Sequence, residues 1–376
     1  MTPKLAIRGQ RPSTCRSRRS RSLKRPLAIL LAAAVGLSAA GQATAATAPR
    51  RALTLEWVGD IALSTQRGLP PSGLERALAP VASRLRDADL TIGNLEGTLS
   101  NGGASKCGSG VGSGTCFAFQ APPSSAGALG ALGFDVVNQA NNHSLDYGYS
   151  GRGQTLAALR IAHVAQTGLP GEITYLHIAG RRVAFLGFAP YPYDGNLLDI
   201  PGAKQLIRRA RRRASLVVVI LHAGAEGAEQ LHTPHGTQYY LGEDRGDARA
   251  FAHAAIDAGA SIVLGSGPHV IRGVERYRGR LIAYSLGNFV GYHTLGDGGV
   301  LSESAILRVA LGEGGRVLAG RWIPIRLMEG LPRFDPSDAS AKLVATLSRE
   351  DFPKGHYTIG PSGLFHLPPP ARGRKH

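Results

Sequence analysis

Side chains that can bind a metal or move a proton follow the apolar stretches of this sequence, where predicted strands end. The densest example is "GFDVVNQANNHSLDYG" at 133–148, in which a β-branched run passes directly into amide, imidazole and carboxylate side chains. Other apolar stretches end in the same way. The residues concerned are Asp60 after "LTLEWVG", Asn94 and Glu96 after "DLTIG", Asn141, Asn142 and His143 after "FDVVNQA", His222 after "LVVVIL" and His269 after "SIVLGSGP".

Asp, Glu, Asn and His side chains together suit Mn, Fe, Zn or Mg better than a metal that prefers thiolates. Ligand sites of α/β sheets lie beyond the carboxyl ends of the strands, so strands that share one sheet would bring these residues to one edge. A dinuclear centre needs one bridging carboxylate and several terminal N or O ligands. One or two ions there would activate a water and hold a phosphoryl or carbonyl oxygen. Asn142 is then expected as a neutral ligand and His143 as a proton donor or charge stabiliser.

Each of these residues also has an ordinary structural interpretation. Asp60 could cap a turn, Glu96 could start a helix, and Asn142 could adopt a left-handed turn conformation. His222 could be a hydrogen-bonded core histidine and His269 a loop residue. Their joint occurrence at strand ends favours a site.

Other chemistries have weaker support. Ser285 in "YSLGN" lacks the nucleophile elbow of a serine hydrolase. The "GSG" at 265–267 lacks the glycine spacing of a dinucleotide-binding loop. The basic runs "RRARRR" at 208–213 and "RGRKH" at the end indicate a solvated helix face and a tail, so we expect no nucleic-acid partner.

The first 45 residues differ in composition from the rest of the chain. They begin with nine Lys or Arg and no Asp or Glu, and continue with the apolar run "PLAILLAAAVGLSAAG" and small residues at Ala-x-Ala spacing. This order is typical of a secretory signal peptide, so we predict cleavage after Ala45 and export to the cell envelope or the medium. The alternative is an uncleaved N-terminal anchor, although the run is short for a membrane span. The remaining chain has 34 basic and 26 acidic residues, a net charge of +8.

Two cysteines follow this segment, Cys107 and Cys116, on either side of "GSGVGSGT". In an exported chain, two cysteines around a Gly-rich loop predict one local disulfide. Two free thiols are the alternative. A cysteine metal site is disfavoured because the chain's third cysteine, Cys15, lies in the predicted signal.

Hydrophobic periodicity predicts the elements that must position these side chains. Strands and helices alternate early, and the almost wholly apolar "SLVVVILHAG" indicates a strand buried on both faces. Antiparallel pairs are predicted at 172–190, 270–290 and 302–327. This pattern predicts an α/β (or α+β) domain of mixed sheets with helices outside, over residues 50–330. Residues 331–376 are expected to form a C-terminal extension with a disordered tail.

The motif order resembles a known family. The stretches "VGDIAL", "ADLTIGNLEGTLS", "GFDVVNQANNHSLDYG", "VVVILHAGAE", "GSGPHV" and "GRLIAYSLGNFV" are similar, in this order, to those of the CapA capsule-synthesis family. These poly-γ-glutamate biosynthesis proteins are also called PgsA. The resemblance covers residues 52–295. "NNH" followed by "D-Y-G", and "YSLGNFV", are its most specific parts.

That family resembles the calcineurin-like metallophosphoesterases, which implies a four-layer αββα sandwich with two mixed sheets between helices. The resemblance also implies residue roles. The implied metal ligands are Asp60 on the first strand, Glu96 (or Asn94) as the bridging acid, Asn142 as the amide ligand, and His222 and His269 as later ligands. His143 takes the place of the catalytic histidine, and Asn141, Asp146 and Glu226 are additional candidates.

The sequence departs from the metallophosphoesterase pattern at two positions that would supply imidazoles. Ala62 stands where a histidine is expected two residues after the first Asp, and Ser266 stands where the family often has histidine. The chain has "HAGAE" where "HWG-x-E" is common, which retains Glu226. The centre is therefore expected to hold one or two ions, with fewer imidazoles than a full two-metal phosphatase.

Two functions follow from these features. The first is an exported metal-dependent hydrolase or transferase that acts on a phosphoester or amide bond in an envelope polymer, with His143 as the proton donor. The second is a non-catalytic accessory protein that binds an anionic polymer such as poly-γ-glutamate. Such a protein would help to assemble or export the polymer beside a membrane-bound synthase complex.

Overall fold

Apolar residues on the central strands give two sheets a face that must be buried. In the computed structural model, which describes residues 51–64, 68–108 and 116–367, these two faces pack against each other. Fully buried side chains from both sheets, such as Trp57, Phe185 and Leu264, fill the space between them. Removing such side chains from water is the main stabilising term of a core.

One sheet has eight strands with parallel and antiparallel neighbours. In spatial order these are β18 (Leu331–Phe334), β17 (Val317–Met328), β16 (Glu303–Leu311), β1 (Leu53–Ile61), β2 (Leu90–Leu95), β5 (Val136–Asn138) and β6 (Ala165–Thr167), with β15 (Asn288–Val290) paired to the end of β1. Strands β1, β2, β5 and β6 are parallel, so their carboxyl ends lie at one edge. Strands β16, β17 and β18 continue the sheet antiparallel.

The other sheet has six strands. In spatial order these are β13 (Val274–Tyr277), β14 (Arg280–Ala283), β12 (Ile262–Ser266), β9 (Leu216–His222), β8 (Arg181–Phe188) and β7 (Thr174–Ile178). Its central strands β8, β9, β12 and β14 are parallel, and β7 and β13 pair antiparallel at the two edges.

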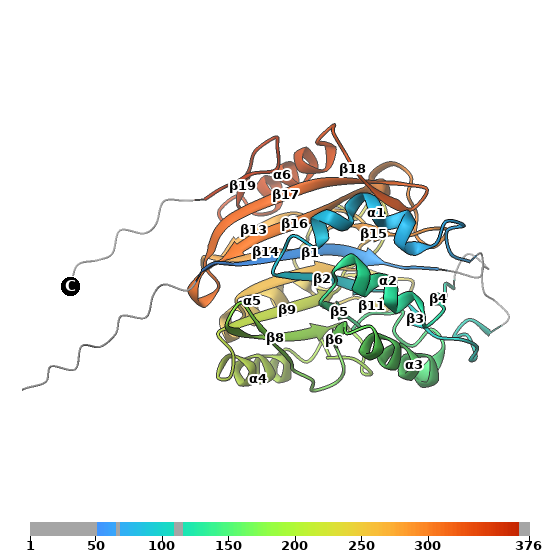
Figure 1. The fold of residues 1–376 in the computed structure, drawn as a ribbon. Helices are drawn as coiled ribbons and strands as arrows, with labels where there is room; N and C mark the ends of the chain where they lie inside the picture. The colour runs from blue at the N-terminus through green and yellow to red at the C-terminus, as the bar shows by residue number, and fades with distance from the viewer. Residues whose placement is uncertain (1–50, 65–67, 109–115, 368–376) are drawn as a thin grey trace, which may run out of the picture. The chain divides into compact units, whose positions relative to one another are not determined.

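Helices cover the outer face of each sheet (Figure 1). The eight-stranded sheet is covered by α1 (Leu74–Leu85), α2 (Ser125–Leu132) and α3 (Gly148–Ile161), and the six-stranded sheet by α4 (Ile200–Arg211) and α5 (Ala248–Ala258). Residues of α6 (Ala339–Asp351) join the core between the sheets, next to β17 and β13. The order helix, sheet, sheet, helix confirms the predicted four-layer αββα sandwich with mixed sheets.

Short elements complete the described chain. These are the strand pairs β3 (Thr98–Leu99) with β4 (Gln120–Ala121), β10 (Tyr239–Tyr240) with β11 (Glu243–Asp244), and β19 (Thr358–Ile359) with β20 (Phe365–His366), and the 3₁₀ turns η2 (Gly299–Ser302) and η3 (Glu313–Gly315).

The three predicted antiparallel pairs are confirmed as β7 with β8, β13 with β14, and β16 with β17. The chain after residue 330 adds β18 to the eight-stranded sheet and α6 to the core. The predicted signal peptide at 1–45 and the end of the predicted tail, 368–376, lie outside the described residues. Within the described residues, no helix has the length and apolar character needed to cross a bilayer.

Candidate metal centre

The candidate site residues come from the carboxyl ends of strands in both sheets, not from one sheet edge. Asp60 is the penultimate residue of β1, and Glu96 directly follows β2 in the eight-stranded sheet. His222 ends β9, and His269 follows β12 in the six-stranded sheet. These residues therefore gather where the edges of the two predicted sheets meet.

A hydrogen bond joins the two sheets near this edge. The indole Nε1 of Trp57 on β1 donates to the carbonyl oxygen of Gly265 on β12, at 3.3 Å. A side chain at position 265 would overlap the backbone oxygen of Tyr284, which would lie 2.2 Å from an added Cβ. Glycine there allows the close approach of neighbouring backbones.

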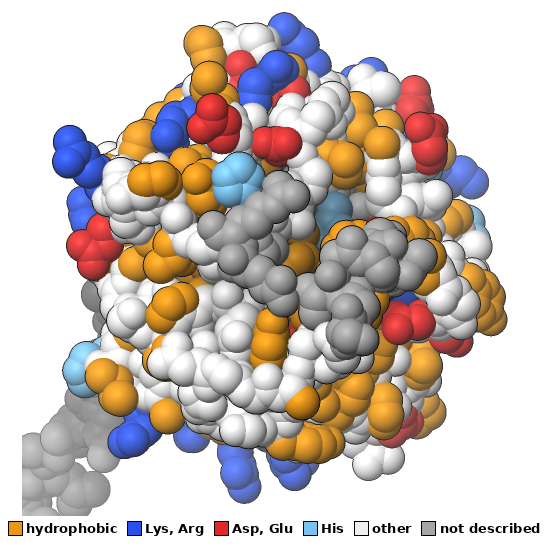
Figure 2. Space-filling model, turned by 90° about the vertical axis from the view of Figure 1, so that its right-hand side faces the viewer, with side chains coloured by type: hydrophobic (Ala, Val, Ile, Leu, Met, Phe, Trp, Pro, Cys, Tyr) orange, Lys and Arg blue, Asp and Glu red, His pale blue; other side chains and the backbone are white. Residues whose placement is uncertain are grey.

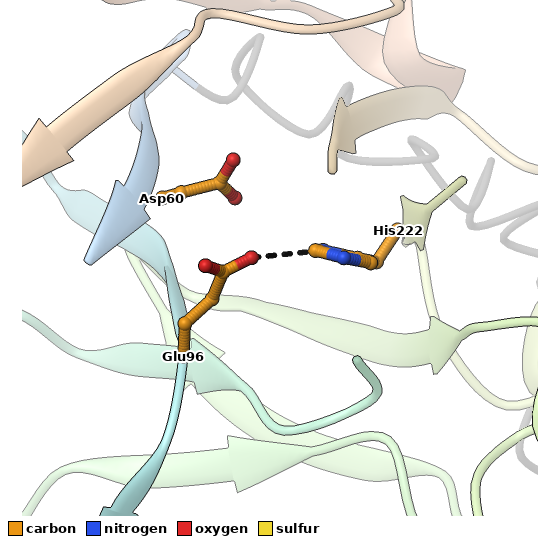
Figure 3. A group of neighbouring side chains, drawn as sticks. All are labelled: Asp60, Glu96 and His222. Carbon is orange, nitrogen blue, oxygen red and sulfur yellow. Dashed lines mark ion pairs between the residues drawn. The ribbon is translucent and has the colours of Figure 1, made fainter. Parts of the chain in front are cut away.

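Asp60, Glu96 and His222 form a group that can hold a cation. Each offers one ligand atom, these atoms lie within 4.8 Å of one another, and all three residues are buried. Figure 3 shows the three side chains converging, with the imidazole of His222 facing the Glu96 carboxylate. Nδ1 of His222 lies 3.4 Å from Oε1 of Glu96.

Asn94 lies beside this group and orients it. Its Nδ2 donates to Oδ1 of Asp60 at 2.9 Å and lies 3.3 Å from Nδ1 of His222. Its Oδ1 accepts hydrogen bonds from the amides of Asn138 and Asn141. Because the amide oxygen of Asn94 is used in this way, Asn94 and Asn141 act as supports for the acidic side chains.

His269 lies between the carboxylates. Its Nδ1 is 3.2 Å from Oδ2 of Asp60 and 2.9 Å from Oδ1 of Asn288. Its Nε2 is 3.6 Å from Oε2 of Glu226 and 4.0 Å from Oε2 of Glu96. The backbone φ of His269 is 61°, a left-handed conformation that costs energy in a residue with a side chain. Strain of this kind is common at functional sites.

Asn142 joins the site through Glu226. Its Nδ2 donates to Oε1 of Glu226 at 3.3 Å. Its Oδ1 is buried and has no hydrogen-bond partner among the described residues. The amide oxygen is therefore free to act as a ligand.

His143 pairs with an acid of its own. Nδ1 of His143 lies 2.8 Å from Oδ2 of Asp146, and the ring stacks on Phe119 with 4.2 Å between centroids. The other carboxylate oxygen, Oδ1 of Asp146, lies 2.7 Å from Nζ of Lys106. The backbone N–H of Phe119 donates to the same acid. The imidazole is therefore fixed in position and orientation by residues on both sides.

Burial sets the protonation states of this group. Burial lowers the pKa of His222 well below its ordinary value, and Arg245 adds to this effect, so the ring is neutral. Burial and the neighbouring Asp60 raise the pKa of Glu96 well above its ordinary value. Burial opposes protonation of His269, but Glu96, Asp60 and Glu226 outweigh it and raise the pKa of His269 to about 10. Without a cation, the site therefore favours retention of protons within the group formed by His269 and the neighbouring carboxylates.

Several residues of the site are not apparent from the sequence. Arg245, 1% exposed at the side chain, pairs with Oε1 of Glu226 at 2.7 Å. It lies in the loop "GEDRGD", which has no periodicity or motif that would single it out. Phe119, Lys106 and Asn138 are likewise identified only by their contacts. The structure also joins Cys107 to Cys116 in a disulfide with a Cα–Cα distance of 5.7 Å, next to Lys106.

A buried ion pair supports the turn that carries His143. The guanidinium of Arg152 on α3 contacts Asp194 and the hydroxyl of Ser144, and its Nη1 donates to the carbonyl oxygen of Tyr193 at 2.7 Å. Ser144 directly follows His143. The ion pair therefore ties this turn to the segment after β8.

Figure 2 shows the side of the molecule that lies on the right in Figure 1, with Lys and Arg side chains mainly around the rim and some of the His side chains closer to the middle. The centre offers carboxylate, imidazole and amide ligands in one group. A group of this composition can bind a divalent cation, and the adjacent His143 can move a proton.

Comparison with known proteins identifies relatives. The family described as "Bacterial capsule synthesis protein PGA_cap" matches residues 54–293, which include every candidate site residue. The capsule biosynthesis protein CapA of Bacillus anthracis is 28% identical over 341 residues, covering 82% of this chain and 75% of that protein. The PGA biosynthesis protein CapA of Bacillus subtilis is 32% identical over 176 residues, covering 42% of this chain and 43% of that protein.

A probable polyglutamine synthesis accessory protein of Mycobacterium tuberculosis is 32% identical over 209 residues, covering 50% of this chain and 53% of that protein. The chain thus spans three quarters of the Bacillus anthracis relative and only about half of the other two.

Two solved structures were also found. A putative 5'-nucleotidase from Staphylococcus aureus in complex with alpha-ketoglutarate has 15% identity and a TM-score of 0.42, covering 79% of this chain and 58% of that one. A 5'-nucleotidase precursor from Thermus thermophilus has 12% identity and a TM-score of 0.43, covering 80% of this chain and 59% of that one. Since both TM-scores are below 0.5, the fold assignment rests on the sheets and helices described above.

Proposed function

We propose that this chain, which belongs to the bacterial capsule synthesis protein family PGA_cap, acts in the synthesis of an anionic envelope polymer through a metal-dependent hydrolase site. The observation that carries the proposal is the buried group of Asp60, Glu96 and His222, whose ligand atoms lie within 4.8 Å of one another. The substrate class is a phosphoester or amide bond of an envelope polymer such as poly-γ-glutamate.

The residues of the centre fit a divalent cation. Oε2 of Glu96 and Oδ1 of Asn142 are buried and lack hydrogen-bond partners among the described residues, which is costly unless another group satisfies them. The neutral ring of His222 is in the state that binds metal. Oxygen and imidazole ligands favour Mn, Fe, Zn or Mg. The residues that would hold the cation are therefore Asp60, Glu96 and His222, with His269 and Asn142 beside them.

When bound, the cation would supply an activated water and polarise the phosphoryl or carbonyl oxygen of the substrate. His143 is the residue that we assign to proton transfer with the substrate. Because its Nδ1–H is donated to Asp146, its Nε2 is the nitrogen left to exchange a proton with the substrate. Phe119 holds the plane of the ring by stacking. Because the ring is neutral, Nε2 first accepts a proton from the attacking water and then gives that proton to the leaving group or stabilises developing charge.

A second function is supported by one of the relatives. The Mycobacterium tuberculosis protein bears the description of an accessory protein of polyglutamine synthesis. Such a protein would bind the growing anionic polymer, or a membrane-bound synthase complex, without performing chemistry. It would not need to retain a stoichiometric metal, which separates it from the hydrolase.

The place of action proposed here is outside the cytoplasm. The basic and apolar composition of residues 1–45 supports export, with cleavage after Ala45 or retention as an anchor. N-terminal sequencing of the protein recovered from the envelope and medium of the native host distinguishes these two forms. Full-length protein found only in the cytoplasm would exclude export.

The experiment that tests the metal site is elemental analysis of the purified protein, wild type beside Asp60→Ala and His222→Ala. We expect about one or two Mn, Fe, Zn or Mg per wild-type chain and loss of this metal in both variants. His177→Ala, which removes an exposed histidine on β7 away from the site, is the matched control and should retain the metal.

A wild-type protein that stays metal-free after loading would exclude the hydrolase and leave polymer binding. A metal-loaded protein would then be screened on phosphodiester and γ-glutamyl amide substrates. Activity that persists in His143→Ala at the wild-type level would argue against the role given to His143.

A further inference from the structure

We infer that the guanidinium of Arg245 occupies the place of a second cation, so that the centre takes a single divalent ion. The inference rests on the proposed function, because it concerns how that same metal site is built. It goes further by assigning the site its stoichiometry and by giving Arg245 a role that the sequence does not reveal.

Arg245 is inside the site, not at its rim. Its side chain is 1% exposed, and Nη2 lies 2.7 Å from Oε1 of Glu226 and 3.5 Å from Nε2 of His222. Nη1 lies 3.8 Å from Oε2 of Glu243. A backbone bond from the N–H of Gly224 to the carbonyl oxygen of Arg245, at 2.9 Å, ties the arginine to the chain just after β9. The positively charged guanidinium of Arg245 is therefore fixed beside the candidate metal ligands.

His222 divides the centre into two halves. Its Nδ1 faces Glu96 at 3.4 Å and Oγ of Ser266 at 3.2 Å, on the side of the acidic group. Its Nε2 faces the guanidinium of Arg245. Nδ1 of His222 is thus available to a metal ion bound by the neighbouring acids. Nε2 faces the positive charge of Arg245, which would repel a metal ion.

The second half has ligands of its own that Arg245 keeps occupied. Oε1 of Glu226 contacts Arg245 and also accepts a hydrogen bond from Nδ2 of Asn142 at 3.3 Å. These groups, with Nε2 of His222, are the types that bind a divalent cation. The guanidinium therefore lies where such an ion would compete for the same atoms.

Charge balance favours this arrangement. Three carboxylates lie inside the site, Asp60, Glu96 and Glu226, whereas Glu243, which also contacts Arg245, is half exposed and screened by solvent. One divalent ion balances Asp60 and Glu96, and Arg245 balances Glu226. A second divalent ion would leave two uncompensated positive charges in a buried site, which is strongly unfavourable.

Missing ligands point in the same direction. The family resemblance leads one to expect imidazoles at positions 62 and 266, where this chain has Ala62 and Ser266. The hydroxyl of Ser266 contacts Nδ1 of His222, so it supports a ligand and adds no imidazole. With Ala62 and Ser266 at these positions and Arg245 buried in the site, this chain has a fixed side-chain charge where a second ion would need ligands.

The test is a Mn²⁺ titration of the chelator-treated protein. Calorimetry measures the stoichiometry, and electron paramagnetic resonance detects coupling between bound ions. We expect the wild type to bind one Mn²⁺ per chain, with the spectrum of an isolated ion. Arg245→Gln removes the charge and should bind two ions, the second more weakly, with a spectrum of coupled ions. Arg245→Lys retains the charge and should bind one.

Arg249→Gln is the matched control, because Arg249 is a buried arginine that bonds to the carbonyl oxygens of Thr233 and Asp351, outside the site. It should leave the stoichiometry at one. Two coupled ions in the wild type would overturn the inference and leave the proposed function standing. No bound ion in the wild type would overturn both. A folded Arg245→Gln that still binds one ion would also overturn the inference, and if this variant fails to fold, the wild-type stoichiometry decides.

Discussion

Asp146 controls which nitrogen of His143 faces the reaction. Because the carboxylate accepts from Nδ1 at 2.8 Å, the neutral ring keeps its proton on that atom. Burial lowers the pKa of His143, although Asp146 opposes this shift, so the ring is neutral at neutral pH. Asp146 thus influences the proposed proton transfer only by fixing the tautomer and orientation of His143.

For a metal-loaded protein with a measured hydrolase activity, His143→Ala should lower kcat by about 10²–10⁴-fold, the range typical of a lost general acid or base. Asp146→Asn should lower kcat less and move the pH profile, since the tautomer is no longer fixed. Metal content serves as the control and should be unchanged in both variants. Equal kcat and an unmoved pH profile in Asp146→Asn would contradict the positioning role.

Metal binding should release protons, because His269 and the neighbouring carboxylates share protons when no cation is bound. The pKa of Glu96 is raised, and that of His269 is raised to about 10. A metal ion must therefore compete with protons for this group at neutral pH. Affinity for the metal should therefore rise as pH rises. Titration calorimetry in two buffers of different ionisation enthalpy counts the released protons.

His269→Gln removes one of the protonated groups and should release about one proton fewer than the wild type. A metal affinity that is the same at about pH 6 and about pH 8 would show that these groups hold no protons in the metal-free protein.

At the scale of elements, the turn between β5 and α3 owes its position to the buried pair of Arg152 and Asp194. Burial raises the pKa of Asp194 to about 7, and Arg152 opposes this shift. The pair connects α3 to the segment after β8, so it connects elements of both sheets. The turn with His143 depends on a contact that is distant in sequence.

Arg152→Ala should lower the free energy of unfolding by about 3–5 kcal/mol, because it leaves the carboxylate of Asp194 buried without its charge partner, and the hydrogen bond from Ser144 does not replace that charge. Urea denaturation measures this change. The double variant Arg152→Ala with Asp194→Asn removes the unpaired charge and should recover part of the loss. A single variant as stable as the wild type would mean that water reaches Asp194.

The disulfide between Cys107 and Cys116 closes a short loop beside Lys106, which contacts Asp146. Replacing both cysteines with serine should lower the free energy of unfolding by about 2–3 kcal/mol, on the chain-entropy account of a loop this short. Unfolding of the wild type with and without reductant measures the same quantity. A double variant that still responds to reductant would show that the effect is not due to this bond.

At the scale of the whole molecule, the candidate metal centre lies where two sheets meet, so its candidate ligands come from both. Asp60 and Glu96 lie at strand ends of one sheet, and His222 and His269 lie at strand ends of the other. A cation held by all of them joins the two sheets. Folding stability and metal binding should therefore be linked.

Saturation with Mn²⁺ at a hundred times Kd should stabilise the folded protein by about 2.7 kcal/mol, since the ion binds the native state only. Differential scanning calorimetry with metal and with chelator measures the shift in Tm. The shift should vanish in Asp60→Ala, and His177→Ala should retain it. Equal Tm values with metal and chelator in the wild type would show that no ion joins the sheets.

Part of this fold could be predicted from local sequence, because periodicity and turn residues act over short distances. The pairs β7 with β8 and β13 with β14 are joined by short turns at Ala179–Gly180 and Arg278–Gly279 and were predictable for that reason. The family and its four-layer architecture were also predictable, since the motifs at the strand ends occur in a specific order.

The sequence by itself determined which residue types follow each strand, and hence the candidate ligands and the chemistry open to them. Only the tertiary structure decided which of the two sheets each strand joins and that Arg245 pairs with Glu226 inside the site. Arg245 follows Glu226 by nineteen residues and lies in a loop without a motif. Local propensities set the conformation of short segments, but the partner of a buried charge is set by how distant segments pack.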